Sequence, residues 1–493
     1  MAALAACGRT TRYTAGPAPT STPATGTTPR SASPATKGAP PTLDWSSCGD
    51  ALDCATVPVP LDRSGHDAGT IRLALWRHPA EGDRIGALLV NPGGPGASGR
   101  FLAAQAKDIF PQAVRDRFDI VAWDPRGTGE SDPVDCGDHL DAFFAVDRDP
   151  HTEAGVQANI TAARDLAAEC ARRSGRLLAH VATRDTVADM DAIRAALGEA
   201  KLTYLGFSYG TYLGTRYALQ YPDKVRAMVL DGAVDPEVSV AASTIQQSEG
   251  FERDLDSFLA DCAQHSSCAF HSGGDPHGAL DKLLAAVAAE PEYAGSGRSL
   301  GPTEARFGIV AALYSGRAAW SDLADALAAA AGGDGSQLLK LSDDYTERSG
   351  DGSYSPSQAA FYATSCLDGQ LPRTLAETRA LAAETARTAP VLGPFNAWLG
   401  LPCAYWPVKP VDGPGSVTAP SSLPTIVVIA GRNDPATPYA WGQALARELH
   451  ARLISVDTEE HTAYVGGGAC VQDPVDDYLT SATPPSTDRS CTP

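Results

Sequence analysis

The chain has 493 residues, more than an ordinary domain of about 100–200 residues, so we expect one large domain or two. Hydrophobic residues make up 43% and charged residues 20%, a globular composition with enough apolar material for a large core. The formal net charge of −20 disfavours nucleic-acid binding, and no apolar run reaches the roughly 18 residues that a membrane span needs.

The amino-terminal segment has features of an exported and anchored protein. Leu4-Ala5-Ala6-Cys7 resembles a bacterial lipobox, which is cut before a cysteine that then carries lipid. Only six residues precede Cys7, whereas a signal peptide has an apolar stretch of about 7–15 residues. Either translation starts further upstream or the match is a coincidence. Residues 16–41 hold seven prolines and six threonines, so we expect residues 1–43 to be a truncated signal and lipobox followed by a disordered tether.

The cysteines indicate the same compartment. An exported protein, either secreted or a cell-surface lipoprotein, can pair its 11 cysteines. We assign Cys7 to lipid attachment, and this lipid anchor is the only contact with a membrane that we expect. The simplest pairing of the other ten joins sequence neighbours: Cys48–Cys54, Cys136–Cys170, Cys262–Cys268, Cys366–Cys403 and Cys470–Cys491. No Cys-x-x-Cys motif and no Cys/His cluster at zinc spacing occurs, so we expect no metal site and no cofactor.

Beyond the tether, predicted strands alternate with predicted helices. Helical periodicity is clear at Thr186–Leu197 and Tyr439–His450. The alternation predicts an α/β fold with a mainly parallel sheet covered on both faces, and functional groups on loops at the carboxyl ends of the strands. Short β-branched or aliphatic runs predict strands at Ile71–Trp76, Ala87–Val90, Phe118–Trp123, Thr203–Phe207, Ala227–Leu230, Thr425–Ile429 and Leu453–Val456.

The alternation lapses between residues 236 and 385. Ala-rich helical segments occur there, and no convincing strand does. We interpret 236–385 as a helical cap inserted before the last strands. It divides the core into residues 44–235 and 386–493. The predicted cap helices include Ser248–Cys262, Gly278–Ala289 and Ala319–Ala331.

A glycine-rich loop follows the second predicted strand. Its sequence is Asn-Pro-Gly-Gly-Pro-Gly at residues 91–96. Glycines leave backbone N–H groups unshielded, so those of Gly93 and Gly94 can converge on an anion.

The same loop has a second interpretation. Residues 94–99 also spell Gly-x-Gly-x-x-Gly, and Asp119 and Asp124 lie near the spacing of an acid that binds a dinucleotide's ribose. Pro95 removes an N–H from that supposed phosphate loop, and exported compartments offer little NAD. We therefore favour the anion-binding interpretation.

The next loop, Asp-Pro-Arg-Gly-Thr-Gly-Glu-Ser at 124–131, contains charged residues that could be mistaken for catalytic ones. We expect Asp124 and Arg126 to form an internal ion pair that holds this loop beside the anion site. Ser131 is expected to bond locally.

The strand Thr203–Phe207 leads into Gly-x-Ser-x-Gly at residues 206–210 and then into a helix. Such a turn needs both glycines because a side chain would collide with the neighbouring strand and helix. It exposes the Ser208 hydroxyl and aims the helix amino terminus at an anion beside it. We predict Ser208 as nucleophile, and the Tyr209 N–H as the donor that completes an oxyanion hole with Gly93 and Gly94.

Two late loops supply the rest of a catalytic triad. Asp434 follows one predicted strand and His461 follows the next, which gives the chain order of the α/β-hydrolases. We expect His461 to take the proton of Ser208 and later deliver it to the leaving group, while Asp434 holds the imidazole tautomer. Asp231, after an earlier strand, is the reserve candidate for the acid.

Five motifs occur in one order: 91–96, 124–131, Gly-Phe-Ser-Tyr-Gly-Thr at 206–211, Val-Leu-Asp-Gly at 229–232 and Cys-Ala-Tyr-Trp-Pro at 403–407. Together they resemble the exported tripeptidyl aminopeptidases, a group of prolyl aminopeptidase-like α/β-hydrolases with a typical carboxyl-terminal region. The resemblance runs from about Trp45 to Cys491. It implies a serine exopeptidase that releases short peptides, often tripeptides, from free amino termini. It also implies Ser208, Asp434 and His461 as nucleophile, acid and base.

One departure from that family is Glu460, where glycine more often precedes the histidine. A carboxylate there could raise the pKa of His461. It could also lie in the path of the substrate.

An aminopeptidase must recognise an ammonium group at a fixed distance from the bond that it cuts. Acids on the helical cap are candidate counter-charges, and three of those on its first helix share a face by their spacing. A solvated acidic face is the alternative. The four acids are Glu249, Glu252, Asp254 and Asp256.

We therefore expect a monomeric enzyme whose partners are peptides with a free amino terminus. A carboxylesterase or lipase is the alternative, because a triad and an oxyanion hole serve esters equally well. A catalytically silent binding lipoprotein that kept the fold is a third possibility.

Overall fold

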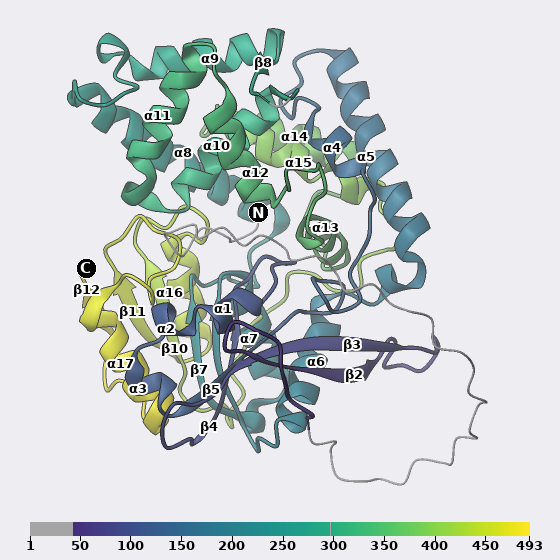
Figure 1. The fold of residues 1–493 in the computed structure, drawn as a ribbon, viewed down its shortest axis with the longest axis vertical. Coiled ribbons are helices and arrows are strands. Elements are labelled where there is room, and N and C mark those ends of the chain that lie inside the picture. Colours follow the sequence, from purple (N-terminus) through teal and green to yellow (C-terminus); the bar gives the residue numbers. More distant parts are fainter. Residues whose placement is uncertain (1–42, 296) are drawn as a thin grey trace.

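A ten-stranded sheet forms the lower half of the molecule in the computed structural model, which describes residues 43–295 and 297–493 (Figure 1). All strands from β5 to β12 in the sheet order run parallel, and β1, β2 and β3 pair antiparallel at one side. The α/β-hydrolase fold and the mainly parallel sheet are thereby confirmed. The order is β1 (Ser46–Ser47), β2 (Asp53–Pro60), β3 (Thr70–His78), β5 (Phe118–Trp123), β4 (Gly86–Asn91), β6 (Leu202–Phe207), β7 (Val225–Asp231), β10 (Val427–Gly431), β11 (Arg452–Val456) and β12 (Arg489–Cys491).

The sequence prediction found seven of these strands and missed β1, β2 and β12. The β2 segment alternates buried and exposed side chains, with Val57 and Val59 inside. Pro58 and Pro60 obscured that alternation, because proline cannot donate a ladder hydrogen bond. The long β2–β3 pair tolerates these prolines because β2 pairs with β1 only at its first residues and leaves its remaining outer edge free.

Helices cover both faces of the sheet with separate apolar cores. One face packs on α6 (Thr183–Ala196), α7 (Tyr209–Gln220) and α16 (Tyr439–Glu448). The other face packs on α1 (Arg100–Ala104), α2 (Ala106–Ile109), α3 (Gln112–Arg115) and α17 (Gly468–Ser481). Strands that are buried on both faces have continuous apolar sequences, and those apolar runs were the basis of the strand predictions.

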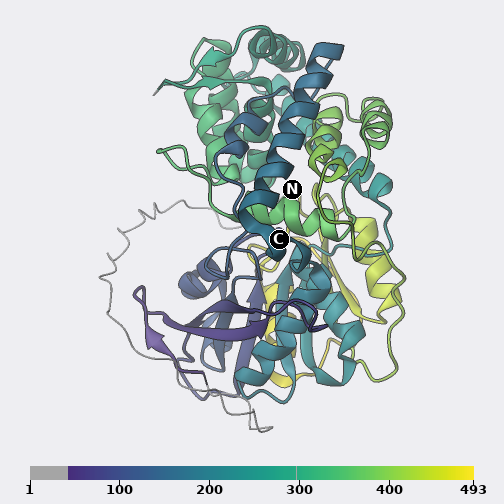
Figure 2. The ribbon, with the colours of Figure 1, turned by 90° about the vertical axis from the view of Figure 1, so that its right-hand side faces the viewer.

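A helical cap with its own apolar core lies above the carboxyl ends of the parallel strands (Figures 1 and 2). It contains the two-residue strands β8 (Glu292–Tyr293) and β9 (Ser299–Leu300), which form a small antiparallel ribbon. The helices are α4 (His139–Phe144), α5 (Glu153–Ser174), α8 (Val240–Gln264), α9 (Pro276–Ala289), α10 (Pro302–Leu313), α11 (Trp320–Ala331), α12 (Ser336–Thr346), α13 (Ser357–Leu367), α14 (Leu375–Thr385) and α15 (Gly393–Leu399).

The cap extends beyond the insertion predicted at 236–385. Helices α4 and α5 precede that insertion and α15 follows it, yet their buried side chains belong to the same apolar core as those of α8 to α14. The 22 residues of α5 were not assigned to the cap. The sequence of an amphipathic helix indicates that one face is buried, but it does not indicate which part of the protein that face packs against.

The five disulfides join the cysteine pairs predicted from sequence proximity, which confirms that pairing. They indicate an extracellular protein. In the described part of the chain, no helix has the length and apolarity needed to cross a bilayer. The predicted lipid site at Cys7 and the predicted tether lie outside the described residues.

Candidate active site

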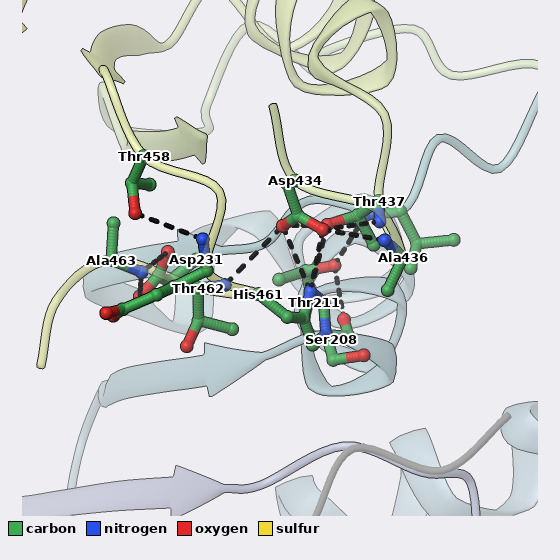
Figure 3. Close-up of polar contacts among 12 residues, drawn as sticks. Ser208, Thr211, Asp231, Asp434, Ala436, Thr437, Thr458, His461, Thr462 and Ala463 are labelled. Carbon is green, nitrogen blue, oxygen red and sulfur yellow. Dashed lines mark hydrogen bonds and ion pairs between the residues drawn. The ribbon is translucent and has the colours of Figure 1, made fainter. Parts of the chain in front are cut away.

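Ser208 occupies a strained turn between β6 and α7. Its backbone has φ 54° and ψ −124°, a conformation that a non-glycine residue adopts only when the surroundings impose it. The surroundings do so here: the Ser208 N–H donates to the carbonyl of Asp231 at 2.9 Å, and its own carbonyl accepts the N–H and hydroxyl of Thr211 at 2.8 and 2.6 Å (Figure 3). Ser208 is thereby held at the carboxyl end of the sheet.

The two glycines of the motif have the steric role expected from the sequence. A Cβ on Gly206 would come within 2.5 Å of the Gly210 carbonyl oxygen. A Cβ on Gly210 would come within 2.9 Å of Asn91 on β4. Strand and helix therefore approach each other around Ser208 more closely than any side chain permits.

His461 and Asp434 meet from the loops after β11 and β10. Nδ1 of His461 lies 3.0 Å from both Oδ1 and Oδ2 of Asp434 (Figure 3). Both side chains are buried. In the described residues, Nε2 of His461 has no hydrogen-bond partner, although it is buried. The pair therefore presents one unengaged ring nitrogen, as a general base requires.

The Asp434 carboxylate is held by its own loop. Oδ1 accepts the N–H groups of Ala436 and Thr437 at 2.8 and 2.9 Å, and Oδ2 accepts the Thr437 hydroxyl at 2.8 Å. Burial acts to raise the pKa of Asp434, but the charge of His461 and these hydrogen bonds outweigh it and lower the pKa. The role of Thr437 was not predicted; its place three residues after a loop aspartate was the available signal.

Asp231, the reserve candidate, has a different task. Its carboxylate accepts the N–H groups of Ala463 at 3.0 Å and Tyr464 at 2.7 Å, just beyond His461. Burial raises the pKa of Asp231 to about 6. Asp231 therefore fixes the loop that carries His461, while Asp434 contacts the imidazole.

The cap completes the surroundings of the histidine. The His461 N–H donates to the Tyr314 carbonyl at 3.3 Å, and the two rings meet edge to face with centroids 5.4 Å apart. On the other side, a Cβ on Gly232 would lie 3.1 Å from Cε1 of His461. The imidazole is thus enclosed by the cap and the β7 loop.

The candidate oxyanion donors differ in availability. The Gly93 N–H donates to the Asn91 side chain at 3.0 Å, so it is already engaged, contrary to its predicted use. Gly94 and Tyr209 both line the cleft with Ser208. The N–H of Tyr209, the first residue of α7, has no carbonyl one turn earlier to bond. Gly93 serves instead by its size, since a Cβ there would lie 2.9 Å from Cβ of Ser208.

A cleft opens beside Ser208, and we call it the Ser208 cleft. Core and cap both line it, with Tyr212 on α7 and Phe361 on α13 among the walls. An adjoining inner chamber shares Gln247, Phe361 and Gln370 with the cleft and continues among Phe307, Tyr345 and Tyr362 of the cap.

The predicted ion pair between Asp124 and Arg126 is wrong. Arg126 pairs with Asp189 on α6, through Nε and Nη2 at 2.7 Å each. Asp124 instead accepts the N–H groups of Gly99 and Glu130 at 3.0 and 2.7 Å. Both side chains do fix the loop, but Arg126 does so through Asp189 and Asp124 through Gly99 and Glu130.

Other contacts agree with the sequence analysis of these loops. Ser131 bonds locally as expected, its hydroxyl donating to the Asp124 carbonyl at 2.7 Å. Asp119, one of the two acids considered for binding the ribose of a dinucleotide, is paired with Arg84 at 2.8 Å. With Asp124 also engaged, neither acid is left to bind a ribose.

None of the four acids proposed on the first cap helix lines the Ser208 cleft or its inner chamber. Glu252 accepts the N–H groups of Val391 and Leu392 at 3.0 Å each, ahead of α15. Asp254 is buried beside Arg253 at 3.5 Å. The spacing that placed these acids on one helix was right, but α8 directs its carboxylates elsewhere.

Glu460 does not line the cleft either. It is half-buried, and a Cβ on Gly316 of the cap would lie 3.1 Å from its Cγ. Burial raises the pKa of Glu460. The residue therefore packs between the histidine loop and the cap, outside the path of a substrate.

A search of residues 43–295 and 297–493 finds no group of three His, Cys, Asp or Glu side chains arranged to hold a metal ion.

Comparison with known proteins places this arrangement in context. Residues 86–467 match the α/β-hydrolase fold family. The chain is 37% identical to the serine protease Hip1 of Mycobacterium tuberculosis over 91% of each protein. It is 38% identical to carboxylesterase B of the same organism, over 96% of this chain and 94% of that protein. It is 33% identical to the tripeptidyl aminopeptidase of Streptomyces coelicolor, over 92% of this chain and 86% of that protein.

Proposed function

Because the chain belongs to the α/β-hydrolase family and is a serine hydrolase, we propose that it is an exopeptidase that cleaves short peptides, tripeptides foremost, from free amino termini. Relatives named as a serine protease and as a tripeptidyl aminopeptidase support the proposal. The observation that carries it is that cap residues such as Phe361 and Gln370 line the Ser208 cleft together with residues of the core, so the cap restricts the space beside Ser208.

The acylation step starts with attack by Ser208 on the scissile carbonyl. His461 accepts the hydroxyl proton at Nε2 while its Nδ1–H donates to Asp434, which stabilises the imidazolium that forms. The imidazolium then gives its proton to the leaving amine. The C–N bond breaks, and the amino-terminal fragment stays on Ser208 as an ester.

Deacylation repeats the sequence with water as the nucleophile. His461 takes a proton from the water, the hydroxide attacks the ester, and the proton returns to Ser208 as the short peptide leaves. In both steps the tetrahedral oxyanion is stabilised by the N–H groups of Gly94 and Tyr209. The amino terminus of α7 adds its positive dipole end at the same place.

The decisive test compares three substrates: a tripeptide anilide with a free amino group, its N-acetylated form and a simple ester. We expect hydrolysis of the free anilide with a much lower kcat/KM for the acetylated one. Equal rates on the two anilides would refute the aminopeptidase proposal.

A carboxylesterase is the second candidate, supported by the relative named carboxylesterase B. The inner chamber supports it too, since its walls carry no charged side chain and would accept a neutral acyl group. In the same experiment this activity would appear as turnover of the simple ester alone.

A silent binding protein is distinguished by labelling. A fluorophosphonate probe should modify Ser208 in the folded wild-type protein, with Ser208→Ala as the blank. We expect labelling to slow by several orders of magnitude in His461→Ala. Absence of labelling in wild type, or an unchanged rate in His461→Ala, would refute the catalytic assignment.

A further inference from the structure

Of the described residues that line the Ser208 cleft, only Asp235 has a charged side chain. The other residues lining the cleft are apolar, hydroxylic, aromatic or amide-bearing, and those of the inner chamber are likewise uncharged. A substrate that reaches Ser208 through this cleft therefore meets a single fixed charge, and that charge is negative. The sequence analysis did not single out Asp235, although it follows β7 directly in Asp-Gly-Ala-Val-Asp-Pro at residues 231–236.

The Asp235 carboxylate is held in place but has no cationic partner. Oδ1 accepts the Glu237 N–H at 2.8 Å, and the residue is only 8% exposed. In the described residues, no Lys, Arg or His nitrogen lies within 4.0 Å of this carboxylate. Among the described residues, six of the eight other buried aspartates pair with a cation or accept at least two backbone N–H groups, as Asp189 and Asp231 do; the exceptions are Asp368 and Asp476.

The wider surroundings reinforce the negative potential. Glu237 and Glu448 lie close enough to interact electrostatically with Asp235, and Arg447 is the one opposing charge that acts on it. Burial, with the charge of Glu237 adding to it, raises the pKa of Asp235. An ionised carboxylate in such a place is costly without a counter-charge, and a bound cation would offset that cost.

We propose that Asp235 binds the free ammonium group of the substrate and so selects acyl groups that begin with an unblocked amino terminus. This inference rests on the proposed exopeptidase function and adds the residue that reads the amine. It replaces the cap-helix acids, none of which lines the cleft. Asp235 and Ser208 both belong to loops at the carboxyl ends of adjacent strands, so the core itself sets the distance between amine and scissile bond.

The test uses Asp235→Asn, which removes the charge but keeps an oxygen to accept the Glu237 N–H. The matched control is Asp256→Asn, which makes the same change at a side chain that is 62% exposed and does not line the cleft. Each protein is assayed on a tripeptide anilide with a free amine, on the N-acetylated anilide, and on aminoacyl p-nitrophenyl esters with free and acetylated amines.

For Asp235→Asn we expect kcat/KM on free-amine substrates to fall about 10–100-fold, mainly through KM, as for loss of a charged hydrogen bond. Acetylated substrates should be unaffected, and Asp256→Asn should resemble wild type on all four. An equal loss on free and acetylated substrates would overturn the proposal in favour of a structural role. No loss on free-amine substrates would overturn it as well.

The ester pair separates this proposal from the proposed function. If wild type hydrolyses esters but no anilide, the peptidase proposal fails, and the ratio between free and acetylated aminoacyl esters still tests Asp235. A ratio that is large in wild type and near one in Asp235→Asn supports the residue's role. A wild-type ratio near one refutes it.

Discussion

The backbone N–H of His461 donates to the carbonyl of Tyr314 at 3.3 Å, and the two aromatic rings meet edge to face at 5.4 Å. One residue belongs to the loop after β11 and the other to the end of α10 in the cap. The neighbouring residues join the same contact, since Arg317 pairs with Glu459 at 2.8 Å. The cap therefore supports the candidate base directly, in addition to covering the cleft.

Changing Tyr314 should affect turnover more than folding. In Tyr314→Leu the edge-to-face contact is lost and the imidazole gains freedom, so we expect kcat to fall about 10-fold or more, because small misplacements of catalytic groups are costly. Tyr314→Phe, which keeps the ring, is the matched control and should retain most of the activity. Steady-state kinetics on the best substrate measure the difference. Equal kcat values for the two variants would contradict a positioning role.

The two aspartates near His461 should respond differently to amidation. Asp434→Asn removes the acceptor that fixes the Nδ1–H tautomer, and we expect kcat to fall about 10⁴-fold. Asp231→Asn leaves one of two buried backbone N–H groups without its carboxylate oxygen, so we expect a loss of about 1–3 kcal/mol in unfolding free energy. Its kcat should fall at most about 10-fold. Denaturant unfolding and steady-state kinetics on both variants check these different roles. A larger loss of kcat in Asp231→Asn than in Asp434→Asn would contradict them.

Asp254 should make stability depend on pH. Burial raises its pKa to about 7 from 3.8, with the charges of Glu459 and Asp434 adding to the shift. The folded protein thus holds this proton more tightly than the unfolded chain does, so stability is lost as pH rises from about 4 to about 7. Asp254→Asn removes that cost. We expect its unfolding free energy relative to wild type to increase over this range, by about 1–3 kcal/mol at pH 8.

The matched control for this effect is Asp256→Asn on the same helix, whose side chain is 62% exposed. It should change the unfolding free energy by less than about 0.5 kcal/mol at any pH. Thermal melts at pH 4 and pH 8 distinguish the two variants. A pH-independent difference between Asp254→Asn and wild type would contradict the burial argument.

Among the five disulfides, the one that joins α13 to the turn at Leu401–Ala404 closes the longest loop, so we expect it to stabilise the fold most. Cys366 and Cys403 are 37 residues apart, and chain entropy assigns such a crosslink about 4 kcal/mol. The Cys48–Cys54 crosslink closes six residues and should contribute about 2 kcal/mol. We therefore expect the double serine variant at 366 and 403 to unfold at lower denaturant than that at 48 and 54. The opposite order would show that strain or residual structure outweighs loop entropy here.

Local chemistry was readable from the chain because it depends on neighbours in sequence. The strand, the two glycines and the helix around Ser208 are contiguous in sequence, so the turn between them was readable as a motif. A short separation between cysteines favours pairing because closing a small loop costs little entropy, and all five predicted pairs form. The parallel strands were likewise predicted from continuous apolar runs, because such strands are buried on both faces of the sheet.

Contacts between distant segments could not be obtained in that way. Arg126 lies two residues from Asp124 and yet pairs with Asp189 on α6, because a buried guanidinium is stabilised by the carboxylate that the packing brings to it. Chain order favoured Asp434 over Asp231, and in the structure Asp434 contacts the imidazole while Asp231 holds the next loop residues. Motif order and strand pattern thus identified the family and the reacting groups, whereas tertiary packing decided the partner of Arg126 and which carboxylate faces the cleft, because those contacts join segments that are distant in sequence.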